Sequence, residues 1–303
     1  MIPGFARKLL GDRDALFLLT GATTMFFLAL DAWLSHLSSG TITRDEWIPV
    51  AFGPPAGLLL LAAGAVALRK RAAAVWIAVP IYLAAIAVGG LGAWLHYSKL
   101  VVPNLSWVKT LEGGPFVYVP PILAPLAFAL TGALGLSALF EESPQGSGRI
   151  RIAGQRHVQM PLAKDRAYLL LVALGIVLAV VSATLDHGHE GLGDPWMWLA
   201  TAAGVFAAVA TFVHGLESAP PPESRIAVLV ALGALALTGL LGEGFHLHAD
   251  IERAGGHLVP EKFIAGAPPM APLLYAYMAT LGAITVLPPA LTPAAPADRI
   301  PPE

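Results

Sequence analysis

Two short stretches of the chain combine histidine with carboxylate residues in a spacing suited to metal binding. The seven residues are Asp186, His187, His189 and Glu190 within "TLDHGHEG" (184–191), and Glu243, His246 and His248 further along. Imidazole with carboxylate suits copper, iron, zinc or manganese, and the absence of cysteine excludes thiolate sites. These seven residues are the predicted ligands of a transition metal, with copper, iron and zinc left open.

The spacing within each stretch limits how the residues act together. Glu243 and His246 are three positions apart, so on a helix they share a face. The same Glu-x-x-His spacing occurs in dinuclear sites of helix bundles, which use the motif twice. His187 and His189 are two positions apart, so both reach one ion only if the helix ends there, as the following "GHEGLGDP" suggests.

A second interpretation assigns the histidines to b-type haem, as the less favoured cofactor. His36 with His96, and His187 with His246, each join the first and third helices of one half of the chain. His36 and His96 are therefore the predicted cofactor-binding residues of the first half. Asp31 lies inside the first apolar run, where an ionisable side chain indicates a function by default. A third interpretation is that these groups are only the wetted ends of helices.

The composition identifies the elements that must position these residues. Of 303 residues, 56% are hydrophobic and 13% are charged, against about 25% charged in a soluble domain, and the mean hydropathy is +0.69. Apolar runs long enough to cross a bilayer recur without strand-like alternation, which predicts an all-α integral membrane protein. The predicted spans are 15–36, 48–68, 73–96, 115–140, 167–187, 195–215, 225–247 and 269–290.

Basic residues predict how these eight spans cross the membrane. Most lysines and arginines collect on the side that holds both termini, and this side is cytoplasmic by the positive-inside rule. We therefore expect a multi-pass protein of the cell membrane with cytoplasmic N- and C-termini. Most histidines then lie at the outer face, where the metal site is expected.

An internal duplication is visible at an offset of about half the chain. "GGLGAWLHY" (89–97) aligns with "GLLGEGFHL" (239–247), and "PPILAPLAFALTGALG" (120–135) resembles "PPMAPLLYAYMATLG" (268–282). "ALD" (29–31) is matched with "TLD" (184–186). The repeat predicts two tandem four-helix bundles, related by a pseudo-two-fold axis along the membrane normal.

This duplication sets the predicted domain boundaries. Residues 1–140 form the first four-helix repeat and 141–166 a basic cytoplasmic loop. Residues 167–303 form the second repeat, with a short Pro-rich cytoplasmic tail. In the loop, attraction to anionic lipid head groups accounts for His157.

The leading functional hypothesis is a membrane metalloprotein of redox chemistry, alone or as a subunit of an oxidoreductase complex. The alternatives are a transporter for a metal ion or small solute and a non-catalytic anchoring subunit. No nucleotide-binding loop or nucleophile motif is present, and the near-zero net charge gives no indication of nucleic-acid binding. Membrane lipids and other subunits are the expected partners, and whether the protein is an enzyme is left open.

Overall fold

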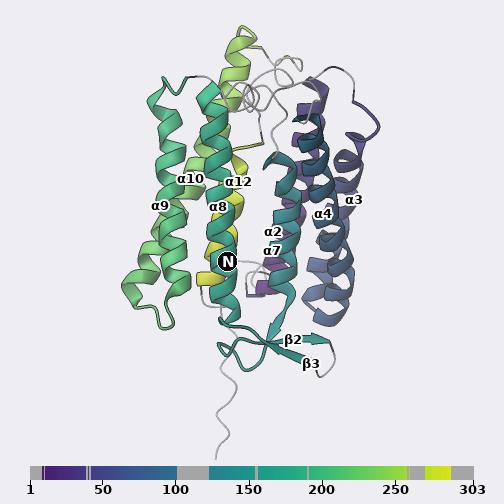
Figure 1. Cartoon of the computed structure of the whole chain (residues 1–303), viewed down its shortest axis with the longest axis vertical. Helices are drawn as coiled ribbons and strands as arrows, with labels where there is room; N and C mark the ends of the chain where they lie inside the picture. The colour runs from purple at the N-terminus through teal and green to yellow at the C-terminus, as the bar shows by residue number, and fades with distance from the viewer. Residues whose placement is uncertain are drawn as a thin grey trace, which may run out of the picture.

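A computed structural model describes most of the chain (Figure 1). The described residues are 9, 11–38, 40, 42–100, 123–153, 156–189, 191–257, 259 and 270–287.

Helices form nearly all of the described structure. They are α2 (Arg13–Ser38), α3 (Trp47–Ala67), α4 (Arg71–Leu100), α7 (Leu123–Leu139), α8 (Lys164–His189), α9 (Pro195–Leu216), α10 (Pro222–Arg253) and α12 (Leu273–Val286). Within the described residues, six of them are long and apolar enough to cross a membrane, while α7 and α12 are shorter apolar helices. The predicted spans 115–140 and 269–290 begin or end outside the described residues.

The helices pack in two groups of four (Figure 1). Helices α2, α3, α4 and α7 contact one another in sequence order, as do α8, α9, α10 and α12, and each group closes between its first and last helix. The two groups meet through α2, α7, α8 and α12. One buried cluster, which includes Leu60 and Tyr82, lies within the first group. The other, which includes Leu232 and Met278, lies mainly in the second group and also contains Phe17 of α2 and Leu134 of α7.

Outward-facing side chains are strongly apolar. Leu58 is 61% exposed, Trp76 80% and Val230 61%, although burying such side chains contributes roughly 1.5–3 kcal/mol each in water. In a bilayer this surface contacts lipid tails, so the helical, membrane-spanning character expected from the sequence agrees with the packing.

Glycines let the helices within each group approach closely. A Cβ atom added to Gly89 on α4 would lie 2.8 Å from the carbonyl oxygen of Pro125 in the first turn of α7. A Cβ atom added to Gly239 on α10 would lie 2.8 Å from the carbonyl oxygen of Pro272, at the start of α12. Small residues allow such backbone contact between membrane helices.

The segment predicted only as a polar loop contains a small antiparallel sheet. Strands β1 (Glu141–Glu142), β2 (Arg149–Ala153) and β3 (Arg156–Gln159) pair in the order β1-β2-β3. The sheet lies at the end of the molecule where α2, α4 and α8 begin (Figure 1). We call this the sheet end, and the opposite end, where these helices finish, the histidine end.

Candidate metal centre at the histidine end

Two histidines from different helices of the first group face each other near the histidine end. His36 lies in the last turn of α2, and His96 lies in the last third of α4. Their ring centroids are 6.1 Å apart, with an angle of 89° between the ring planes. Both side chains are half-buried.

The second group repeats this arrangement. His187 near the end of α8 and His246 on α10 have ring centroids 6.3 Å apart, with an interplanar angle of 75°. Both are again half-buried. The fold therefore brings together the two pairs that the haem interpretation named, one pair in each group of helices.

The distance between the two ring centroids can be compared with the distances expected for a direct hydrogen bond and for a shared metal ion. A direct N–H···N hydrogen bond of about 2.9 Å would bring two ring centroids to about 5.2 Å. A metal in line between the two imidazoles, with bonds of about 2.0 Å, would hold them about 6.3 Å apart, and tetrahedral ligation about 5.1 Å. The observed 6.1 and 6.3 Å leave room for a metal between the two imidazoles, and they also fall within the range of about 4.5–7 Å of ordinary edge-to-face ring contacts.

Three carboxylates lie near these pairs. Asp31 on α2 interacts electrostatically with both Asp186 on α8 and Glu243 on α10, so acidic groups of the two helix groups face each other. Asp31 Oδ1 and Glu243 Oε2 are buried and have no hydrogen-bond partner within the described residues. A buried carboxyl group is stabilised by a proton, a hydrogen-bond donor or a counter-charge, and a bound cation is one source of the last.

Two of the predicted ligands, His189 and Glu190, have no described side chain. Helix α8 ends at His189, two residues beyond the end of the predicted span and within the stretch where the sequence predicted an ending. Residues two apart on a continuous helix do not share a face, and the joint role of His187 and His189 stays a prediction. The side chain of His189, and Glu190 as a whole, lie outside what is described.

His248 is also separate from the pairs. It lies on an extension of α10 to Arg253, beyond the span expected to end at 247. Its side chain is 77% exposed, and its Nε2 lies 4.0 Å from Glu252. Its assignment as a ligand stays a prediction.

Among the described residues, no group of three or more histidine, aspartate or glutamate side chains is arranged to hold a metal ion. The predicted site with several protein ligands from α8 and α10 therefore has no geometric support in this part of the chain. A centre that takes only two imidazoles from the protein, as a haem iron does, requires no third group.

Several threonine hydroxyls within the described helices are occupied by hydrogen bonds of their own helix. The hydroxyls of Thr20, Thr24 and Thr131 donate to carbonyl oxygens four residues earlier in their own helices. Thr238 and Thr280 do the same in the second group. Hydroxyls bonded within their own helix stabilise the backbone and leave no donor directed at a solute.

Comparison with protein-family models, curated proteins and solved structures finds no match to this chain.

Proposed function

We propose that this protein is a redox-active membrane protein that holds one metal centre between each pair of histidines at the outer face. His36 with His96, and His187 with His246, are the ligands, and iron of b-type haem is the centre that fits them best. The observation that carries the proposal is that each group of helices brings a histidine of its first helix beside one of its third helix, at a ring separation that leaves room for a metal. The termini then lie in the cytoplasm, as the basic residues of the sheet end favour.

Equivalent glycine contacts support the tandem duplication behind this pairing. Gly53 on α3 approaches Ala29, and Gly204 on α9 approaches Val180, both on the preceding helix. A shift of 151 positions converts the first contact into the second, and the same shift takes His36 to His187.

The corresponding shift on the third helices is 150 positions. It takes Gly89 to Gly239 and His96 to His246. In the register of the first helices, Asp31 corresponds to Ser182 and not to Asp186, so the two aspartates are not repeat partners. The histidines, and not the aspartates, are the elements that both halves retain.

A nonhaem metal ion is the second candidate for the second pair. Its support is the Glu243 side chain, which has a buried oxygen without a hydrogen-bond partner and shares a helix face with His246. The first half has Ala93 at the matching position, so this candidate predicts different centres in the two halves.

Electron transfer has more support than transport. An ion path would need polar groups that continue from the histidine end to the sheet end. Thr131 and Thr238 are bonded within their own helices, and the buried clusters between are largely apolar.

The test is the absorption spectrum and the metal content of the full-length protein purified in detergent after expression with iron and a haem precursor. The proposal predicts a Soret band, sharp α and β bands on reduction, and iron in proportion to haem. His96→Ala should weaken these signals, while the control His248→Ala should leave them intact. Purified protein with neither haem nor transition metal would contradict the proposal.

A further inference from the structure

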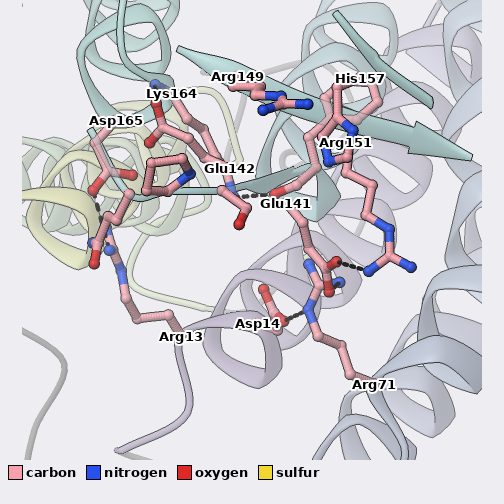
Figure 2. A pocket seen from close by; sticks show the side chains of 14 residues that line it. Arg13, Asp14, Arg71, Glu141, Glu142, Arg149, Arg151, His157, Lys164 and Asp165 are labelled. Atoms are coloured by element: carbon pink, nitrogen blue, oxygen red, sulfur yellow. Dashed lines mark hydrogen bonds and ion pairs between the residues drawn. The ribbon is translucent and has the colours of Figure 1, made fainter. Parts of the chain in front are cut away.

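A cavity of about 680 Å³ lies at the sheet end, beneath the small sheet (Figure 2). Residues at the starts of α2, α4 and α8 line it, together with β1 and β2 and with His157 of β3. Its volume is in the range of small-molecule sites. The cavity lies at the opposite end of the molecule from the histidine pairs, so a ligand bound there is independent of the proposed metal centres.

The four carboxylates that line the cavity are already engaged. Asp14 accepts from Arg71, and Glu141 accepts from Arg71 and Arg151. Asp165 accepts from Arg13 at 3.2 Å (Figure 2).

The carboxylate of Glu142 accepts hydrogen bonds from backbone N–H groups. Its carboxylate accepts from the amides of Gly146, Gly148 and Lys164, so it stabilises the turn before β2 and the start of α8. No carboxylate lining the cavity therefore remains without a donor.

The sheet presents its basic face to the cavity. In the ladder Glu141 is opposite Arg151, and Arg151 is opposite His157. Because side chains alternate along a strand, Arg149 is on the same face as Arg151. Arg149, Arg151 and His157 all line the cavity, whereas Ile152, on the other face, is 59% exposed and does not.

Two cations of the cavity form no close ion pair within the described residues, although the charges of Asp14 and Asp165 attract Lys164 from a longer distance. Arg149 has no ion pair within the described residues, although it lines the cavity (Figure 2). Lys164 donates its Nζ to the carbonyl oxygens of Ala138 at 2.7 Å and Phe140 at 2.6 Å, which orient the ammonium without cancelling its charge. The groups left to a ligand are hydrogen-bond donors with positive charge.

We propose that this cavity binds a phosphate group, held by Arg149 and Lys164 with Arg151 and His157 beside it. Guanidinium pairs with phosphate through two parallel hydrogen bonds, and an ammonium adds a point charge. The ligand is a phospholipid head group at the membrane boundary or a soluble phosphate compound. Both present the same anionic oxygens.

The test uses the full-length protein in detergent micelles and in nanodiscs. Native mass spectrometry measures retention of phosphatidylglycerol against phosphatidylcholine, and isothermal titration measures binding of inorganic phosphate. Arg149→Gln removes a cation without breaking an ion pair, so folding should be retained. Arg156→Gln is the matched control, because Arg156 is exposed on β3 and does not line the cavity.

We expect Arg149→Gln to weaken binding by about tenfold or more, the usual effect of losing a hydrogen bond to a charged group, and Arg156→Gln to change it little. Preference for phosphatidylglycerol, with inorganic phosphate as competitor, identifies a lipid ligand. Phosphate binding without lipid preference identifies a soluble one. Equal loss in both variants, or no binding of either probe by the wild type, would overturn the proposal.

Discussion

The imidazole rings of His36 and His96, on α2 and α4, have centroids 6.1 Å apart near the histidine end. The rings of His187 and His246 repeat this relationship at 6.3 Å on α8 and α10. The separation exceeds that of hydrogen-bonded imidazoles by about 1 Å, which suits two imidazoles on one metal and also lies within the range of ordinary edge-to-face ring contacts. Two independent pairs with the same spacing are the basis of the functional proposal.

A substitution of Glu243 distinguishes the haem centre from the nonhaem metal ion. If haem iron takes only the two imidazoles, Glu243→Gln should leave haem bound and change mainly its reduction potential, because a nearby negative charge stabilises the oxidised iron. Spectra and a redox titration of the variant measure both effects. Glu252→Gln, at an exposed position of α10, is the control. Loss of metal from Glu243→Gln would favour the nonhaem centre.

The contact between α4 and α7 predicts a steric effect at one of two adjacent glycines. Gly89→Ala should lower the free energy of unfolding by about 1–3 kcal/mol, since the new Cβ meets the backbone of Pro125 and Ala129. Gly90→Ala is the matched control, because nothing lies within 4 Å of its Cβ position. Thermal unfolding in detergent compares the two variants. Equal melting temperatures would show that the helices do not approach as described.

Arg71 connects three segments at the sheet end. Its guanidinium bonds Asp14 of α2, Glu141 of β1 and the carbonyl oxygen of Leu139. Because the side chain is 33% exposed, we expect Arg71→Gln to cost only about 1–2 kcal/mol, with a smaller loss at high salt. Arg69→Gln, at an exposed residue before α4, should cost less than about 0.5 kcal/mol. Chemical unfolding at two salt concentrations measures both, and equal losses would contradict the assigned role of Arg71.

Hydrophobic runs were sufficient to predict the helices, because bilayer thickness fixes the length of an apolar span. They did not predict that α10 continues to Arg253, since the extension carries polar residues and leaves the apolar run. The sheet of residues 141–159 was missed for a related reason. Its strands are short, and their charges were interpreted as markers of orientation.

The candidate site could be predicted only in part. The pairs His36–His96 and His187–His246 were named from the repeat, but as the less favoured interpretation. His189 and His248 neighbour the paired residues along the chain, and their assignments as ligands stay predictions. On a helix, residues two apart point in different directions, so closeness in sequence is a poor guide to convergence.

Haem and metal stoichiometry in matched variants tests the central claim most directly. We predict two centres per chain in the wild type, one in His36→Ala, one in His187→Ala and none in the double variant. Absorption spectra and elemental analysis on the same samples give the count. Unchanged content in the double variant, or loss of both centres from one single variant that remains folded, would contradict two independent centres held by the histidine pairs.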